Sequence, residues 1–162
     1  MKSVPAMDVI LTIDENGVLE NAEFDDLAGL DVEPDFEEVM DYAHKTTVVV
    51  PDGVTRIGDR AFYDKRWLTD VTLPDSVLSI GNDAFTDCNY LTSVTMSDSV
   101  SVIGSRAFAW CESLTSITIM NEGAVIAPDA FYECGKDLLF RAKAGSSAEK
   151  HAAENSFRFE AM

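Results

Sequence analysis

The chain has 162 residues, of which 46% are apolar, and this content predicts one folded domain with a packed core instead of a disordered segment. Twelve basic residues stand against 29 acidic ones. The net charge of −17 argues against binding to nucleic acid or to an anionic membrane surface, because both require clustered lysine and arginine. Residues 1–46 carry 13 of the acidic residues and 2 basic ones, so we expect a solvated acidic face there, or a docking surface for a basic partner.

The sequence contains no targeting or membrane-spanning pattern. No apolar run reaches the length of about 18 residues that a membrane helix needs, and no apolar stretch follows Lys2 as it would in a signal peptide. The chain's own start therefore predicts a cytoplasmic protein, unless an export signal lies outside it.

Residues 1–46 predict an N-terminal cap made of a hairpin and a helix. Val9, Leu11 and Ile13 alternate as in a strand, and residues 14–17 have turn composition. A helix of about residues 34–45 follows from apolar residues at helical spacing, which are Phe36, Val39, Met40 and Ala43. We expect this helix to cover the first repeat.

The same hairpin carries a weak calcium-binding pattern. If Gly17 takes the sixth position of an EF-hand loop, then Asp14, Asn16 and Glu23 take the third, fifth and twelfth positions, where oxygen ligands are needed. However, Thr12 takes the first position, where Asp is usual, and a strand precedes the loop in place of a helix. We favour the hairpin and keep calcium binding by residues 12–23 as an alternative.

Residues 47–140 repeat a unit of 23 residues four times. Glycine recurs at 58, 81 and 104, and an Ala-Phe pair recurs at 61–62, 84–85, 107–108 and 130–131. Each copy predicts a strand with alternating inward residues, a turn, a second inward pair, and a short helical segment that begins at Asp59, Asn82 or Ser105. One copy cannot bury its own apolar stripe, so the fold class is an α/β repeat solenoid with a parallel β-sheet on one face.

The repeat resembles the BspA-type, or treponemal-type, bacterial leucine-rich repeat. The resemblance rests on the pattern P-D-x-V-x-x-I-G-x-x-A-F-x-x-C-x-x-L-x-x-V-x-L, which is most complete from Pro74 to Met96. It implies a short right-handed solenoid from a family of bacterial surface and secreted proteins associated with adhesion and protein interaction. It also implies a cell-surface or secreted location, and it brings no catalytic residues.

Residues 141–162 predict a C-terminal cap. Ser146 and Glu149 form a capping box for a helix of about residues 147–154, and residues 157–159 alternate as a last strand. We expect the three regions 1–46, 47–140 and 141–162 to form one structural domain.

Cysteine and histidine give no clear sign of chemistry. Cys88, Cys111 and Cys134 share one column of the repeat, where we expect buried reduced thiols that fill space. A partial disulfide is the first alternative, and zinc is disfavoured because this column offers no further cysteine or histidine ligands. His44 and His151 are predicted to lie at opposite ends of the solenoid. A catalytic Ser-His-Asp or Cys-His arrangement requires hydrogen-bond contact, which this separation disfavours, so we expect no enzyme and no cofactor.

The candidate binding face consists of outward strand positions, which are Thr69, Thr72, Thr92, Thr95, Thr115 and Thr118. Threonine suits a strand surface on propensity alone. The predicted sheet covers on the order of 250 Å², which is less than the roughly 800 Å² that each partner buries in a standard interface. A partner must therefore also use loops, the acidic cap or a second protomer.

Trp67 and Tyr90 share a column just before the strands and form the candidate hot spot. We expect alanine at both positions to leave folding intact and to abolish partner capture. The predicted function is a non-catalytic protein-interaction module that binds an unidentified protein. The alternative is a structural or surface-display element with weak self-association.

Overall fold

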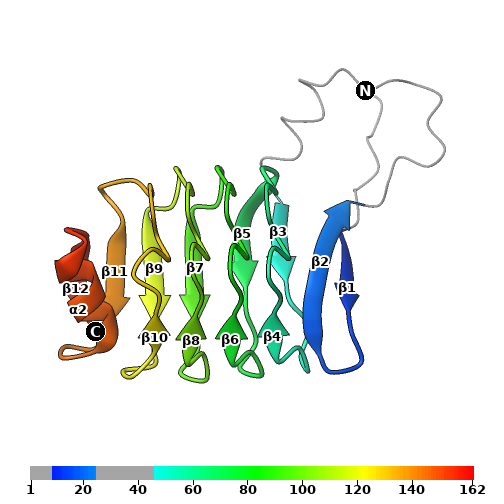
Figure 1. The fold of residues 1–162 in the computed structure, drawn as a ribbon, viewed down its shortest axis with the longest axis horizontal. Coiled ribbons are helices and arrows are strands. Elements are labelled where there is room, and N and C mark those ends of the chain that lie inside the picture. Colours follow the sequence, from blue (N-terminus) through cyan, green and yellow to red (C-terminus); the bar gives the residue numbers. More distant parts are fainter. Residues whose placement is uncertain (1–8, 25–45) are drawn as a thin grey trace, which may run out of the picture.

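The computed structural model describes residues 9–24 and 46–162, and in it the chain winds into a β-solenoid (Figure 1). Each full coil, here called a rung, adds one strand to each of two sheets. Sheet A has the strand order β1-β2-β4-β6-β8-β10, and sheet B has the order β12-β11-β9-β7-β5-β3. The stacked rungs confirm the solenoid that the 23-residue period predicts.

Sheet B contains the strands that the leucine-rich spacing predicts. Val71, Val94 and Ile117 stand opposite one another in register and are buried, as expected for inward positions. Neighbouring strands of this sheet pair in parallel, and they are β3 (Thr46–Val49), β5 (Leu68–Thr72), β7 (Ser93–Met96), β9 (Ser116–Ile119), β11 (Leu139–Ala142) and β12 (Arg158–Ala161).

The repeat strands of sheet A contain the second residue of each second inward pair, which is Ile57, Ile80 or Ile103, and the sequence placed these residues in the core without assigning them to a sheet. Backbone groups of these extended residues would be left unpaired beside the core, and they pair with the next rung instead. The strands are β4 (Arg56–Ile57), β6 (Ser79–Ile80), β8 (Val102–Ile103) and β10 (Val125–Ile126).

The predicted N-terminal hairpin is present. β1 (Val9–Ile13) pairs antiparallel with β2 (Val18–Phe24), and β2 pairs in parallel with β4, so the hairpin extends sheet A. The predicted helix of about residues 34–45 lies outside the described residues.

A column of phenylalanines fills the space between the sheets. Phe62, Phe85, Phe108 and Phe131 are buried, and successive ring centroids lie 4.8, 5.0 and 5.2 Å apart with rings within 7° of parallel. Rungs approach so closely beside this column that a Cβ on Gly81 would lie 2.7 Å from the Asp59 backbone nitrogen. The recurrent glycine is therefore required by packing.

The short helical segment that each copy predicts is not formed in the described residues. The segments that begin at Asp59, Asn82 and Ser105 each contain two residues with left-handed backbone conformations, and the fourth copy contains one, at Glu133; a left-handed residue cannot continue a right-handed helix. The pairs with positive φ are Arg60 and Asp64, Asp83 and Asp87, and Arg106 and Trp110.

The C-terminal cap consists of the helix α2 (Ser147–Glu154) and strand β12. Ser146 Oγ accepts a hydrogen bond from the Glu149 N–H at 3.3 Å, as the capping box predicts. The Glu149 carboxylate, however, accepts from the N–H of Gly145 at 2.6 Å instead of from that of Ser146. Ala148, His151 and Ala152 are buried, so α2 closes the core at this end. No helix in the described ranges is long and apolar enough to cross a membrane.

Candidate functional site

The outer face of sheet B presents side chains in regular rows, because its strands pair in register. Alternate residues of each strand point outward, and the equivalent residues of successive strands form two rows along this face. The first row contains Thr47, Asp70, Ser93, Ser116, Leu139 and Arg158. The second contains Val49, Thr72, Thr95, Thr118, Arg141 and Glu160. This outer face brings three of the predicted threonines, Thr72, Thr95 and Thr118, into one row.

The other three predicted threonines, Thr69, Thr92 and Thr115, form a separate column at the start of the strands. Thr92 Oγ1 donates to the Thr69 carbonyl and Thr115 Oγ1 to the Thr92 carbonyl, both at 3.2 Å. Thr92 Oγ1 also lies 3.1 Å from Asp70 Oδ1. Their hydroxyls tie neighbouring rungs together, so this column has a structural role in the sheet.

Trp67 and Tyr90 differ in their surroundings. Trp67 is half-buried and packs against the core, while the Tyr90 side chain is 37% exposed. We therefore revise the expectation that alanine at both positions leaves folding intact, because truncating Trp67 removes core contacts. Tyr90 is the residue of this pair with the larger exposed fraction.

A second aromatic pair, on the turns that follow the sheet A strands β8 and β10, was not identified from the sequence. The Trp110 ring lies edge-on to the Tyr132 ring, with centroids 5.5 Å apart, and Tyr132 is 51% exposed. Trp110 has φ 55°, a left-handed conformation that is rare for a bulky residue. The sequence did contain a signal for Trp110, because it is an aromatic residue in a repeat column whose other members, Asp64, Asp87 and Glu133, are acidic.

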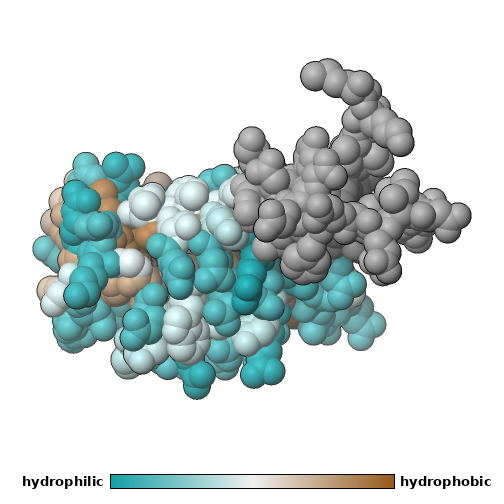
Figure 2. Space-filling model, turned by 90° about the horizontal axis from the view of Figure 1, so that it is seen from above, coloured by the Kyte–Doolittle hydropathy of each residue, from teal (hydrophilic) through white to brown (hydrophobic). Residues whose placement is uncertain are grey.

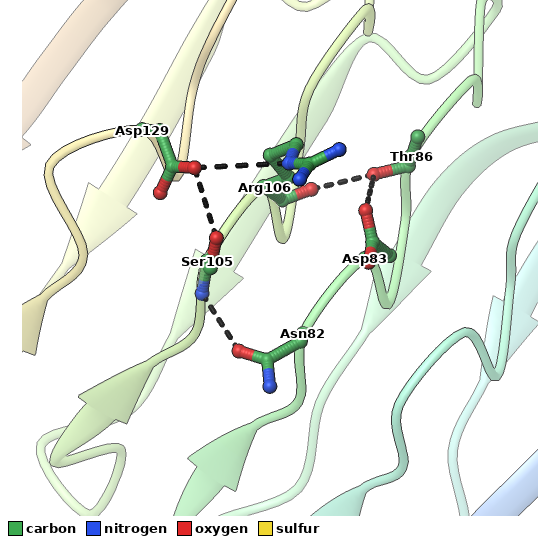
Figure 3. Close-up of polar contacts among 6 residues, drawn as sticks. All are labelled: Asn82, Asp83, Thr86, Ser105, Arg106 and Asp129. Atoms are coloured by element: carbon green, nitrogen blue, oxygen red, sulfur yellow. Dashed lines mark hydrogen bonds and ion pairs between the residues drawn. The ribbon is translucent and has the colours of Figure 1, made fainter.

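A polar ladder runs along the corner between the sheets (Figure 3). Asn82 Oδ1 accepts the Ser105 backbone N–H at 2.9 Å, and Ser105 Oγ donates to Asp129 Oδ2 at 2.9 Å. One rung earlier, Asp59 Oδ1 accepts the Asn82 N–H at 2.9 Å. These residues were expected to begin helices within their own copy, and each of Asp59 and Asn82 instead caps the backbone of the next rung.

Beside this ladder, Thr86 is a buried polar side chain whose hydrogen bonds are satisfied. Its Oγ1 donates to the Arg106 carbonyl at 2.6 Å and lies 3.4 Å from Asp83 Oδ1, while the Arg106 guanidinium lies 3.7 Å from the Asp129 carboxylate (Figure 3). The whole corner is thus a structural network between rungs.

The cysteine column has the packing role that the repeat predicts. Cys88, Cys111 and Cys134 are free thiols that donate to the carbonyls of Phe62, Phe85 and Phe108 at 3.0, 3.1 and 2.9 Å. Burial raises the pKa of Cys88 and of Cys134 to about 12, and it raises the pKa of Cys111 well above its usual range. Neutral thiols of this kind are poor nucleophiles and poor metal ligands.

The proposed calcium ligands are not brought together. Asp14 Oδ1 accepts the backbone N–H groups of Val18 and Asn16, both at 2.8 Å, and the bond from Val18 is the main cause that lowers the pKa of Asp14. Glu23 lies opposite Ile10, several residues up the hairpin from the turn, and accepts from Asn21 Nδ2 at 2.6 Å. Asp14 thus stabilises the hairpin turn itself.

Of the two histidines, His44 lies outside the described residues, and His151 is buried in α2. Its ring centroid lies 5.7 Å from that of Phe131 and 5.8 Å from that of Phe140. Burial lowers the pKa of His151. Residues 9–24 and 46–162 contain no group of three or more His, Cys, Asp or Glu side chains arranged to hold a metal ion.

A shallow groove crosses the turns that lead from sheet B to sheet A. Lys143 forms an ion pair with Glu122 in it, and Asn121 Nδ2 donates to the Asp98 carbonyl at 2.8 Å. The groove lining comprises Asp75, Ser97, Asp98, Met120, Asn121, Glu122 and Lys143. Its side chains are largely polar, and several bond to one another.

Solved structures of similar fold include three bacterial leucine-rich repeat proteins. A leucine-rich repeat protein from Bacteroides capillosus is 28% identical, with a TM-score of 0.58 over 85% of this chain and 96% of its own. A leucine rich cell surface protein from Faecalibacterium prausnitzii is 26% identical, with a TM-score of 0.58 over 73% of this chain. A leucine-rich repeat protein from Bacteroides ovatus is 20% identical and supports the fold alone, with a TM-score of 0.56 over 99% of this chain and 41% of its own.

The chain matches only 33% of the length of the Faecalibacterium protein. Comparison with functionally curated proteins gives no match. The family described as "BspA type Leucine rich repeat region (6 copies)" matches residues 38–152, which extends beyond the four copies counted at 47–140 into both predicted caps. This match and the similar fold of the solved leucine-rich repeat proteins agree with the resemblance seen in the repeat. The chain belongs to the BspA-type leucine-rich repeat family.

Proposed function

We propose that this chain is a non-catalytic protein-interaction module that binds its partner through the outer face of sheet B. The observation that carries the proposal is the outward row of Thr72, Thr95 and Thr118, in which Thr72 and Thr95 are exposed and Thr118 is half-buried, on strands that each pair in parallel with both neighbours. Hydroxyls of short side chains on a paired sheet can exchange hydrogen bonds with a partner at little cost in conformational entropy.

The area of this face requires that neighbouring loops take part. Six strands spaced by about 4.8 Å and about 13 Å long give on the order of 350 Å², still below the roughly 800 Å² per partner of a standard interface. The exposed rings of Tyr90 and Tyr132 lie on the segments that lead from sheet A to sheet B and supply aromatic surface of the type found at hot spots. We include both in the binding surface.

We propose that the protein acts at the bacterial cell surface, where it recognises or adheres to its partner. The similar Faecalibacterium protein is described as a cell surface protein, which supports this location. Trp67 contributes by holding the turn in place from its half-buried position.

Affinity capture with paired variants tests the proposal. Thr95→Lys places a long charged side chain in the centre of the outer face, whereas Val125→Lys makes the same kind of change on sheet A, where Val125 is 66% exposed. We expect a protein retained by the wild type to be retained by Val125→Lys and lost by Thr95→Lys. Titration of that purified protein should then give a tenfold or greater loss of affinity for Thr95→Lys alone. Equal binding by the two variants would contradict the proposal.

A further inference from the structure

The two sheets end differently at the C-terminal side of the solenoid. At the end of sheet A, the start of α2 bonds to the segment that leads into the last strand, β10. The Ser147 N–H donates to the Glu122 carbonyl at 2.9 Å, and Ser147 Oγ donates to the Ala124 carbonyl at 2.7 Å. The last strand of sheet B is β12, and no strand of the described ranges pairs with its other edge. One sheet is therefore closed by the cap, and the other presents an edge strand.

The hydrogen bonds of β12 identify which backbone groups lie on this edge. The Arg158 N–H donates to the Leu138 carbonyl at 3.1 Å, and the Met162 N–H donates to the Ala142 carbonyl at 3.0 Å. Backbone groups alternate in direction along a strand, so those of Phe159 and Ala161 point away from β11. These two residues offer donors and acceptors to an added strand.

Charge and hydropathy both favour a second copy at this end. Residues 1–135 carry 25 acidic and 7 basic residues, whereas residues 136–162 carry 4 acidic and 5 basic ones. The C-terminal end is thus the part of this acidic chain where two copies repel each other least. Figure 2 shows hydrophobic surface gathered at the same end, and Met162 is 55% exposed there.

We propose that two copies associate through antiparallel pairing of β12 about a two-fold axis, with Phe159 opposite Phe159 of the second copy. In this register the two Phe159 residues exchange backbone hydrogen bonds, and Arg158 stands directly opposite Glu160 of the second copy. Symmetry makes this charge pair occur twice. The register shifted by two residues places Glu160 opposite Glu160, so like-charge repulsion disfavours it.

The side chains already have the arrangement that this pairing needs. Arg158 and Glu160 both point to the outer face, and Glu160 is held by an ion pair of 3.0 Å with Arg141 of the neighbouring strand. Arg158 has no carboxylate partner within the described part of the chain. Dimerisation would place it beside one.

The dimer would join two six-stranded sheets into one continuous sheet with both outer faces on the same side. This roughly doubles the flat area available to a partner, but pairing through β12 does not depend on the proposed binding function. Thr95 lies three strands away from β12, so loss of partner binding and loss of self-association can be measured separately.

Sedimentation equilibrium over protein concentrations from roughly 1 μM to 1 mM tests the proposal. We expect the weight-average mass of the full chain to rise from the monomer value of 17.7 kDa toward twice that value. Arg158→Glu or Glu160→Arg should each weaken dimerisation about tenfold or more, because like charges then face each other. The double variant R158E/E160R should restore it, since the opposite charges are exchanged.

Two further variants distinguish pairing through β12 from a general effect of charge at this end. Lys136→Glu makes the same kind of charge change at an exposed residue outside β12, and it should leave dimerisation unchanged. Ala161→Pro removes an outward N–H from the edge and should weaken dimerisation, with urea unfolding used to verify that it folds. A wild type that stays monomeric throughout would overturn the proposal, as would a folded double variant that does not recover or a Lys136→Glu variant that dissociates equally.

Discussion

The inside and the outside of the rungs differ in how strictly they repeat. Phe62, Phe85, Phe108 and Phe131 are identical in all four copies and stack about 5 Å apart. The outward row beginning at Val49 changes from threonine in the middle to Arg141 and Glu160 at the end. An inward residue contacts its equivalents above and below, so one change disturbs two rungs, whereas an outward residue contacts mainly water. The strict inward columns therefore report packing, whereas the outward rows are not needed for packing and are available to a partner.

Removing one ring from the column should have the largest effect. Phe85→Ala deletes a buried ring that stacks on both Phe62 and Phe108, and we expect it to lower the free energy of unfolding by about 3–5 kcal/mol. Urea denaturation measures this loss. Tyr132→Ala, which truncates an exposed ring, serves as the comparison and should cost much less; equal losses would show that the column is not the main source of stability.

Adding a methyl group between rungs should have the next largest effect. In Gly81→Ala the new Cβ would lie 2.7 Å from backbone atoms of Gly58 and Asp59, and we expect a loss of about 1–3 kcal/mol. The nearest atom to a Cβ on Gly123 is 3.8 Å away, so Gly123→Ala should change stability by less than about 0.5 kcal/mol. Thermal or urea unfolding of the pair would contradict the packing argument if Gly123→Ala were the more harmful.

The polar ladder should contribute less than the core. Asn82→Ala removes the acceptor for the Ser105 N–H, and we expect a loss of about 0.5–1.5 kcal/mol. Asn82→Asp keeps a side-chain oxygen in the position that Asp59 fills one rung earlier, so it should retain most of the stability. If alanine and aspartate gave the same unfolding midpoint, the hydrogen bond would have no energetic role.

The smallest effect should be a pH dependence at the C-terminal cap. Burial lowers the pKa of His151 below its ordinary 6.5, so the unfolded chain takes up a proton before the folded chain does as the pH falls. The free energy of unfolding should therefore decrease as the pH falls below about 6.5 and level off below the folded pKa. His151→Leu should flatten this dependence between pH 7 and pH 5, and His44→Gln should leave it in place. An unchanged slope in His151→Leu would assign it to another group.

The 23-residue period predicts the columns because a spacing of identical residues follows directly from stacking. It does not predict the turns, because the left-handed positions are occupied by Arg60, Asp64 and Trp110 instead of glycine, and these residue types also occur in helices. The second sheet was missed because its strands of two residues are too short to show alternation. For Trp67 and Tyr90, a shared column concealed different burial, since the sequence shows which residues are stacked and not how deeply each one lies.

The central claim is that inward columns hold the fold while the outer face of sheet B is not needed for it. Urea unfolding of Thr95→Lys beside Phe85→Ala tests this claim most directly. We predict that Thr95→Lys unfolds within about 0.5 kcal/mol of the wild type, as expected for a surface substitution, while Phe85→Ala loses several times more. A Thr95→Lys variant as unstable as Phe85→Ala would contradict the claim.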